Sequence, residues 1–355
     1  MNSFNYDKFK KMQPMKYYEP GGLEHSKAKD MIANKNNEFI ALEKLDGEWA
    51  RVIIMEDEIL IQSRSISKVT GIYGDKTLHV PHIVEELLEK FSAGTVLLGE
   101  LGFEDRSKTS RDVGSILRCL PPKAIHRQEK EKLHLFVFDC LADSGIDLTQ
   151  ASFEERFKSV RSSIPYGTKY IFSVKYSEKD FMKMAESCWE KGGEGIVIMR
   201  RDSMYNPGGR KSWDSLKVKK KLGEIEAKVV DFIEPKQHYE GSEIASWKYW
   251  ASADNGEPME WKNPFGEDYL EMTDGMMYPV TKPYYYGWKN GIVVEYEGRT
   301  IKVSSGLTDY DREWLASSAA KEMLDSGKLY AAITGMELTE DSIRHPVLVR
   351  LRDDL

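Results

Sequence analysis

Short apolar runs separated by polar residues follow one another along the first half of the chain, as is typical of strands. Three of them lie between residues 38 and 63: "EFIALEKL", "EWARVIIM" and "EILIQS". Asp46-Gly47 joins the first two runs and predicts a tight β-hairpin turn there. Two longer runs, "TVLLGELGF" (95–103) and "LHLFVFDCL" (133–141), predict buried strands.

Helices are indicated by apolar residues three and four positions apart and by capping residues. Residues 81–91 place five apolar side chains on one face of a helix that begins near the proline at 81. Ser152 with Glu155 predicts a capping box before a second helix, and Ser177 is predicted to open a third. Two strands are predicted after these helices: "EGIVIMRR" (194–201) and "DSLKVKKK" (214–221).

A shift in composition at Leu222-Gly223 indicates a boundary between two domains. Beyond it the chain is rich in strands, with a hairpin predicted at Glu297-Gly298. One helix is expected from Thr308 to about Ser326, with Asp311 as the cap partner of Thr308. The pattern therefore predicts a first domain of mixed strands and helices and a second that is a small β-barrel.

An aromatic-rich insert at about residues 247–288 interrupts the strands of the second domain. Its 11 aromatic side chains could stack on bases, or they could form a satellite hydrophobic cluster under a long insertion. The insert holds seven acidic residues against three lysines, which disfavours contact with phosphates. We therefore favour the hydrophobic cluster.

Composition places the chain among globular proteins of a reducing compartment. Apolar residues make up 41% of the 355 residues and charged residues 31%. No apolar run is long enough for a membrane span, and the N-terminus lacks the apolar core of a signal peptide. Cys119, Cys140 and Cys188 are widely spaced, which argues against a zinc site or a disulfide scaffold and predicts a cytoplasmic protein.

The net charge of −7 weighs against a nucleic-acid partner, but its distribution changes that interpretation. Residues 210–221, "RKSWDSLKVKKK", carry six basic residues and one acidic residue. A basic strip on an acidic protein is compatible with binding to a phosphate backbone.

Five groups of polar residues lie at the ends of the predicted strands or inside them. Taken singly, each is best explained as a solvent-facing or paired charge. Together, lysines that match phosphates and carboxylates that match Mg²⁺ indicate an anionic ligand with a divalent metal. The groups are Lys44 with Asp46, Ser63-Arg64, Glu100, Glu194, and Lys217 with Lys219.

Lys44 is the candidate nucleophile among these residues. Lys217 and Lys219 alternate in a strand, so they point to the same face. If Lys44 faces those two lysines and a metal, the positive surroundings favour the neutral amine that a nucleophile requires. A position at a strand end, before a tight turn, fixes that amine where a phosphorus atom can reach it.

The segment "KLDGEW" (44–49) resembles motif I, Lys-x-Asp-Gly, of the covalent nucleotidyltransferases, which include DNA ligases, RNA ligases and mRNA capping enzymes. A single match of this kind is weak, but other motifs of that superfamily follow in order. They are "SR" (63–64), "GELGF" with Glu100, "FVFDCL" with Phe138, "EGIVIM" resembling motif IV and "SLKVKK" resembling motif V.

The second half of the chain resembles one group within this superfamily. "IKVSSGLTDYDREWL" and "SIRHPVLVRLRDD" are similar to the OB domain of ATP-dependent DNA ligases, especially the small ones of bacteriophages, and "NPGGRKSW" also resembles the ligase pattern. The resemblance implies an α+β fold. A nucleotidyltransferase (adenylation) domain over residues 1–222, with antiparallel sheets and flanking helices, would precede an OB-fold β-barrel over residues 223–355.

Three positions depart from the family pattern. Trp49 stands where the family usually has an arginine two residues after the motif I glycine, and Arg51 follows. Leu355 ends the chain where a lysine usually closes the final motif. Leu42 stands in place of a glutamate two residues before the nucleophile, with Glu43 adjacent to it.

The resemblance implies ATP as substrate and Mg²⁺, or alternatively Mn²⁺, as metal. It also implies a monomer that binds nicked duplex DNA without sequence specificity and does not contact a membrane. Lys44 would attack the α-phosphorus, Lys217 and Lys219 would grip that phosphate as catalytic residues, and Asp46 would orient groups near the nick. The remaining roles are nucleotide binding for Leu42, Glu43, Trp49, Arg64, Glu100 and Phe138, metal binding for Glu100 and Glu194, and DNA binding for Arg64, Arg210, Lys211, Arg350 and Arg352.

Two alternatives stay open. The first is a related enzyme, either an RNA ligase or an mRNA capping guanylyltransferase. The second is a non-catalytic OB-type nucleic-acid-binding protein with a decayed nucleotide pocket, against which the intact set of lysines and glutamates argues.

Overall fold

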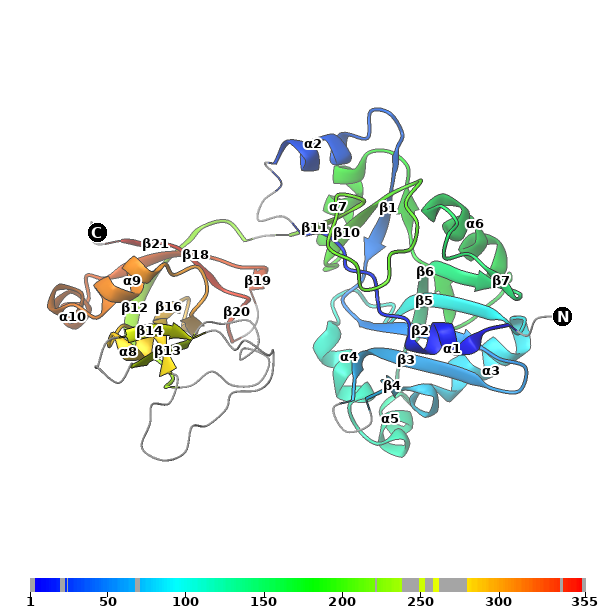
Figure 1. The fold of residues 1–355 in the computed structure, drawn as a ribbon, viewed down its shortest axis with the longest axis horizontal. Helices are drawn as coiled ribbons and strands as arrows, with labels where there is room; N and C mark the ends of the chain where they lie inside the picture. The colour runs from blue at the N-terminus through cyan, green and yellow to red at the C-terminus, as the bar shows by residue number, and fades with distance from the viewer. Residues whose placement is uncertain are drawn as a thin grey trace. The chain divides into compact units, whose positions relative to one another are not determined.

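The computed structural model describes residues 4–19, 23, 25–67, 71–220, 222–237, 249–252, 258–261, 280–338 and 341–352. The chain forms two compact units, unit 1 (Met1–Lys219) and unit 2 (Lys220–Leu355), whose elements are labelled in Figure 1. The domain boundary at residue 222 stays a prediction. Most of the aromatic insert lies outside the described residues.

Unit 1 contains two sheets. Sheet A has the strand order β11-β10-β1-β9, and all its pairs are antiparallel. Sheet B has the order β4-β3-β2-β5-β6-β7, with β8 parallel to β6. The strands of sheet A are β1 (Phe39–Lys44), β9 (Tyr176–Ser177), β10 (Gly195–Arg200) and β11 (Ser215–Lys219); those of sheet B are β2 (Glu48–Ile54), β3 (Ile59–Ile66), β4 (Tyr73–Asp75), β5 (Thr95–Gly102), β6 (His134–Asp143), β7 (Ile146–Asp147) and β8 (Ile171–Ser173).

Helices flank the sheets of unit 1 (Figure 1). The capping box predicted at Ser152 and Glu155 is present at the start of α6, which packs on β6. The helix predicted near Pro81 is also confirmed. The helical elements are α1 (Tyr6–Lys11), α2 (Ser26–Ala33), the 3-10 turn η1 (Thr77–His79), α3 (Pro81–Lys90), α4 (Ser110–Leu117), α5 (Pro121–Arg127), α6 (Phe153–Ser163) and α7 (Phe181–Glu190).

Unit 2 is built on a five-stranded antiparallel sheet of order β17-β16-β12-β18-β21. A bridge between Ser305, just beyond β17, and Val347 of β21 joins its two edges, as in a closed barrel. The predicted hairpin at Glu297-Gly298 connects β16 to β17. The elements are β12 (Ile225–Ile233), β13 (Tyr249–Ser252), β14 (Pro258–Trp261), β15 (Val280–Thr281), α8 (Lys282–Tyr285), β16 (Gly291–Tyr296), β17 (Arg299–Val303), α9 (Asp309–Leu315), α10 (Ser318–Asp325), β18 (Tyr330–Thr334), β19 (Glu337–Leu338), β20 (Ile343–Arg344) and β21 (Val347–Arg352).

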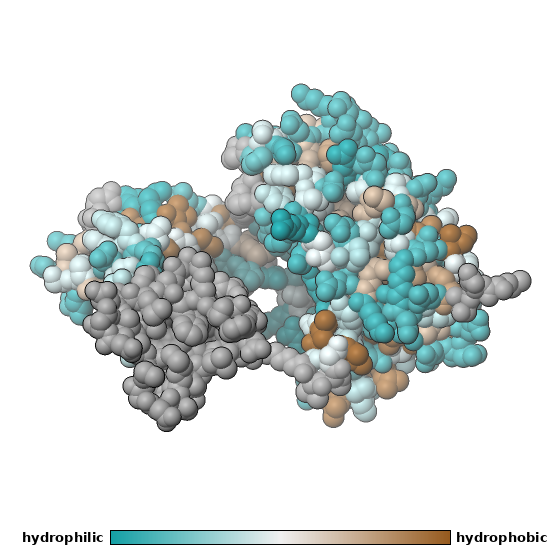
Figure 2. Space-filling model, in the orientation of Figure 1, coloured by the Kyte–Doolittle hydropathy of each residue, from teal (hydrophilic) through white to brown (hydrophobic). Residues whose placement is uncertain are grey.

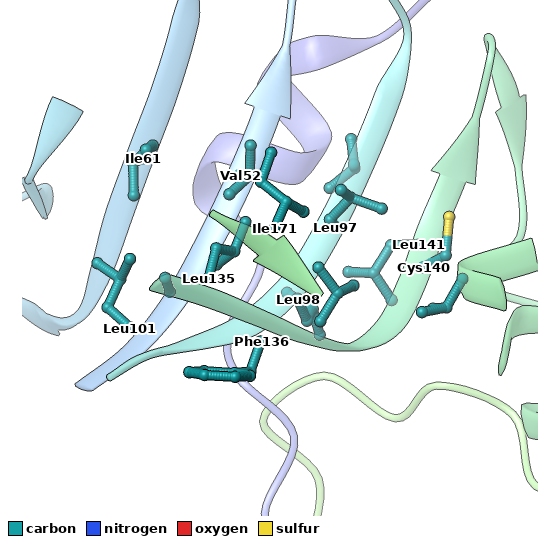
Figure 3. Close-up of a cluster of buried hydrophobic side chains, with 14 of the residues drawn as sticks. Val52, Ile61, Leu97, Leu98, Leu101, Leu135, Phe136, Cys140, Leu141 and Ile171 are labelled. Atoms are coloured by element: carbon teal, nitrogen blue, oxygen red, sulfur yellow. The ribbon is translucent and has the colours of Figure 1, made fainter. Parts of the chain in front are cut away.

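The hydrophobic core of unit 1 is centred on sheet B. Side chains from β2, β3, β5, β6 and β8 meet in one cluster (Figure 3). Burial of this much apolar surface is the main force that holds the sheet together, and it fixes the strands that carry Trp49, Glu100 and Phe138. The labelled members are Val52, Ile61, Leu97, Leu98, Leu101, Leu135, Phe136, Cys140, Leu141 and Ile171.

One face of unit 1 is largely polar. Figure 2 shows one face, on which hydrophilic side chains predominate and hydrophobic ones are scattered among them. In the described part of the chain, no helix combines the length and apolar character needed to cross a membrane.

The hairpin predicted at Asp46-Gly47 is wrong. β1 belongs to sheet A and β2 to sheet B, so this turn passes the chain from one sheet to the other. Gly47 makes the crossing possible because it packs against β5. A Cβ atom at this position would lie 2.3 Å from the carbonyl oxygen of Leu101 and 2.8 Å from Cγ of Glu100.

Gly47→Ala is therefore expected to destabilise unit 1 by about 1–3 kcal/mol, the usual cost of overpacking, and to displace Glu100. Chemical denaturation measures the loss. Gly102→Ala is the matched control on β5, because its Cβ atom would meet only the Phe136 ring at 3.8 Å. Equal stability of the two variants would contradict this explanation of the turn.

Two predicted helix boundaries are also wrong. Ser177 lies in β9, paired with Ala41, and α7 begins only after Asp180. The single helix expected from Thr308 to Ser326 is two helices, α9 and α10. The hydroxyl of Ser317 accepts a hydrogen bond from the N–H of Ala320 and so starts α10 as a separate helix. The predicted capping box of Thr308 and Asp311 is present.

Candidate active site

Three strands of sheet A align the charged residues of the site. Lys44, the last residue of β1, is paired with Gly195, the first residue of β10. Gly195 is in turn paired with Lys219 of β11. Only glycine fits at position 195, for two reasons. The φ of Gly195 is +140°, and a Cβ atom there would lie 2.1 Å from the carbonyl oxygen of Val218. The alignment brings both lysines beside Glu194, which directly precedes β10.

The side chains of these residues form a row of alternating positive and negative charges. Nζ of Lys44 is ion-paired with Oε2 of Glu194, and Nζ of Lys219 lies 3.3 Å from Oε1 of the same glutamate. On its other side, Nζ of Lys219 lies 3.1 Å from Oε1 of Glu19. Nζ of Lys217 lies 3.7 Å from Oε2 of Glu19. The predicted orientation of Lys217 and Lys219 toward one face is therefore confirmed.

A cavity opens next to these charges, between elements of both sheets. Its wall is partly polar around Lys44 and largely apolar elsewhere. Among the residues proposed from sequence, it is lined by Leu42, Glu43, Lys44, Trp49, Arg64, Glu100, Phe138 and Lys217. Residues that sequence reasoning missed complete the lining: Tyr17, Leu45, Phe153, Val174, Val197 and Met199.

Glu100 on β5 has an unusual electrostatic environment in this cavity. Burial raises its pKa to about 7, and the nearby carboxylates of Glu194 and Glu48 also raise it. The ammonium of Lys44 and the N–H of Gly47 act in the opposite direction. A cation bound between Glu100 and Glu194 would relieve this cost.

The donor set fits a hydrated Mg²⁺ ion better than a metal held by protein alone. Magnesium is usually bound by one or two carboxylates together with waters and substrate phosphates. Within the described residues, no group of three or more His, Cys, Asp or Glu side chains could hold a metal ion. Glu100 and Glu194 therefore fit an ion that a nucleotide helps to bind.

The surroundings of Lys217 disfavour the charged form of its side chain. Burial lowers its pKa, with further lowering from the neighbouring charges of Lys219, Lys44 and Arg64, while Glu19 opposes the shift. An anion placed among these cations would be stabilised by all of them. The cluster is therefore suited to phosphate.

Glu43, the neighbour of Lys44 in the sequence, forms a separate ion pair. It is buried, and Nε of Arg106 lies 3.0 Å from its Oε1. Arg106 also donates to the carbonyl oxygen of Phe103 and stacks over the Phe136 ring at 4.5 Å. The pair links β1 of sheet A to the loop after β5 of sheet B, and so holds the two walls of the cavity together.

Arg51 cannot substitute for the arginine that Trp49 replaces. Its side chain is fully buried and bonds Oε1 of Gln62 at 2.7 and 2.9 Å. It also donates to the carbonyl oxygens of Lys10 and Met12, which fastens the N-terminal segment to β2. Trp49 itself lines the cavity.

Some of the predicted residues do not line the cavity. Arg210 and Lys211 are exposed on the loop between β10 and β11. Asp46 is half-buried in the turn between the sheets. Arg350 and Arg352 lie on β21 in unit 2 and make ion pairs with Glu224 at 2.8 Å and Glu226 at 2.9 Å, respectively. Leu355 lies outside the described residues.

Tyr17 and Glu19 are the most informative residues that sequence reasoning missed. Both belong to residues 12–19, a segment without helix or strand that is hydrogen-bonded to β11 through Tyr18. This segment has no periodic apolar pattern, so only its position before the first predicted strand could have drawn attention to it. Burial raises the pKa of Tyr17, so its hydroxyl stays neutral.

A cavity lined by Lys44 between two mainly antiparallel sheets, followed along the chain by a five-stranded barrel, is the architecture of a nucleotidyltransferase-type domain and an OB-fold domain. Two solved structures share this fold. "Pmar-Lig_PreS3" has a TM-score of 0.58 and 18% identity over 96% of this chain and 67% of its own. A structure from an analysis of Lig E DNA ligases has a TM-score of 0.56 and 15% identity over 96% of this chain and 99% of its own.

The chain belongs to the family described as the ATP dependent DNA ligase domain, whose model matches residues 24–219. The DNA ligase of Natronomonas pharaonis is 28% identical over 173 residues, or 48% of this chain and 30% of the relative. The DNA ligase of Nitrosopumilus maritimus is 25% identical over 201 residues, or 53% of this chain and 32% of the relative. The chain thus matches less than a third of the length of these relatives.

Proposed function

We propose that this protein is an ATP-dependent DNA ligase that seals nicks in duplex DNA through a lysyl-AMP intermediate on Lys44. The observation that carries the proposal is the ion pair of Lys44 with Glu194, which also pairs with Lys219, on the wall of a partly apolar cavity. Membership of the ATP-dependent DNA ligase family supports the same chemistry.

In the first step, Nζ of Lys44 attacks the α-phosphorus of ATP. A nitrogen–phosphorus bond forms, and the bond to the pyrophosphate oxygen breaks. An ammonium has no free electron pair, so Nζ must first lose a proton, and Glu194 is the hydrogen-bonded carboxylate that can accept it. Lys217 and Lys219 neutralise the α-phosphate during attack.

The apolar part of the cavity is proposed to hold the adenine ring. Phe138 would pack against one face of the base, with Phe153 and Tyr17 from other elements completing the slot. Leu42, where the family usually has a glutamate, adds an apolar contact rather than a hydrogen bond.

In the second step, the 5′-phosphate at the nick takes the AMP group from Lys44. In the third, the 3′-hydroxyl attacks that activated phosphate, which joins the strand and releases AMP. Arg64, Arg210 and Lys211 are proposed to hold DNA phosphates, with Arg350 and Arg352 adding contacts from unit 2. Asp46 is proposed to orient groups near the nick.

Glu100 and Glu194 would hold Mg²⁺, or Mn²⁺ in its place, when the nucleotide is bound. The ion supplies charge neutralisation at the phosphates. The residues of the chain position the reactants, which is the larger requirement in phosphoryl transfer.

A sealing assay tests the function and separates it from the alternatives. Nicked DNA with ATP should be sealed, and the product should appear as a longer labelled strand. Label transfer from GTP rather than ATP would instead indicate a capping guanylyltransferase, and preference for nicked RNA would indicate an RNA ligase. Binding to DNA with no label transfer would indicate the non-catalytic binder.

DNA binding should not depend on sequence and should weaken steeply with salt. If Arg210, Lys211, Arg350 and Arg352 each neutralise one phosphate, the affinity should fall about a hundredfold between roughly 50 and 200 mM salt. Replacing Arg210 and Lys211 together by alanine should reduce the slope of the log–log plot by about 2. Titrations of two duplexes of unrelated sequence measure both effects, and a sequence-selective footprint would contradict the proposal.

A further inference from the structure

Glu19 occupies the face of β11 from which the phosphate-binding lysines project. Its carboxylate oxygens lie 3.1 Å from Nζ of Lys219 and 3.7 Å from Nζ of Lys217. The Glu19 side chain is 40% exposed, whereas the two lysines are 15% and 21% exposed. One carboxylate thus contacts both cations that a nucleotide phosphate would need.

The backbone holds Glu19 in this position. The N–H of Lys217 donates to the carbonyl oxygen of Tyr18 at 2.9 Å, and the N–H of Tyr18 donates to Oγ of Ser215 at 3.1 Å. The ring of Tyr18 packs against Trp213 with centroids 4.3 Å apart. These contacts attach Tyr18, the neighbour of Glu19, to β11 and to the loop just before it, so the backbone holds Glu19 beside the two lysines.

The charge on Glu19 is maintained by its partners. Partial burial alone would raise its pKa, but the hydrogen bond and charge of Lys219, with Lys217 and Lys44, outweigh burial and lower it. The carboxylate is therefore ionised at neutral pH. An arriving phosphate meets lysines that already have a counter-ion.

We propose that Glu19 is an internal competitor of the nucleotide phosphate. It neutralises Lys217 and Lys219 before a nucleotide binds, gives way to the α-phosphate, and returns to both lysines as AMP leaves after sealing. This exchange makes the site favour ligands of high negative charge and speeds the release of the monophosphate product. The inference rests on the proposed function, because it assigns phosphate binding to these two lysines.

Glu19→Gln tests the competition, since it removes the charge and keeps the shape. Isothermal titration with AMP should give a dissociation constant about three- to tenfold lower than that of the unaltered protein. The apparent KM for ATP in Lys44 adenylylation should fall in the same direction. The difference should shrink as salt is added, because a half-exposed carboxylate is screened.

Glu178→Gln is the matched control. Glu178 also makes a 3.1 Å ion pair and is 50% exposed, but its partner is Arg201, away from the lysines. This variant should bind AMP as the unaltered protein does. Glu19→Ala should behave as Glu19→Gln does, which separates the loss of charge from any effect of the new amide.

A failure of the proposed function can be distinguished from a failure of the competitor role of Glu19. If the unaltered protein forms no lysyl-AMP, the proposed function is wrong. If it forms lysyl-AMP while Glu19→Gln binds AMP no more tightly, only the competitor role is overturned. Weaker AMP binding by Glu19→Gln would also overturn it, because Glu19 would then be supporting the lysines rather than competing for them.

Discussion

Lys44→Ala is expected to abolish lysyl-AMP formation and to lower nick sealing by a factor on the order of 10⁴ or more, as removal of a covalent nucleophile does. The amine is the only part of the side chain that the first step uses. Glu194 keeps Lys219 as a partner at 3.3 Å when the Lys44 amine is removed, so folding should be unaffected. Gel analysis with labelled ATP measures the first step, and a nicked duplex measures the whole reaction.

Two control measurements show whether Lys44 acts as the nucleophile or has only a structural role. Lys183→Ala, an exposed lysine on α7, should retain full activity. Lys44→Ala itself should still seal a nick that already carries AMP on its 5′-phosphate, because the third step does not form a bond to the lysine. Sealing from ATP by Lys44→Ala at a rate near that of the unaltered protein would rule out the assignment.

Arg156→Met is expected to destabilise unit 1 by about 3–5 kcal/mol, because it leaves a buried carboxylate without its partner. Arg156 and Asp139 are fully buried and joined by two hydrogen bonds of 2.8 and 3.1 Å. Burial raises the pKa of Asp139, while Arg156 opposes that rise. The pair connects α6 to β6, which places Phe153 and Phe138 on the cavity wall.

Urea denaturation, followed through the transition of unit 1, measures this effect. Arg200→Met removes an exposed ion pair with Asp202 by the same substitution and should cost no more than about 1 kcal/mol. The double variant Asp139→Leu with Arg156→Met should recover most of the stability, because a buried pair can be exchanged for apolar side chains at little cost. If Arg156→Met destabilised unit 1 no more than Arg200→Met does, the buried pair of Arg156 and Asp139 would not be a major source of stability.

Local patterns in the sequence were sufficient for most of the strands and for the orientation of key side chains. Alternation in β11 places Lys217 and Lys219 on one face, and both contact Glu19. The apolar run around Phe138 forms β6, with Phe138 on the cavity wall. These features depend on neighbours within a few residues, which is why the sequence reveals them.

Features set by distant partners could not be predicted in the same way. Asp46-Gly47 has the composition of a hairpin turn, yet β1 pairs with β10 and β2 with β5, and these partners determine where the chain goes. The pairing of Glu43 with Arg106 spans 63 residues. Glu19 lies on a segment without helix or strand, and its role depends on β11, almost two hundred residues later in the chain.

Mass spectrometry after incubation with ATP and Mg²⁺ tests the central claim most directly. We predict that the protein gains one AMP group and that digestion maps it to the peptide containing Lys44, with no label on peptides containing Lys217 or Lys219. An AMP group on another lysine, or no added mass under conditions in which nicked DNA is sealed, would contradict it.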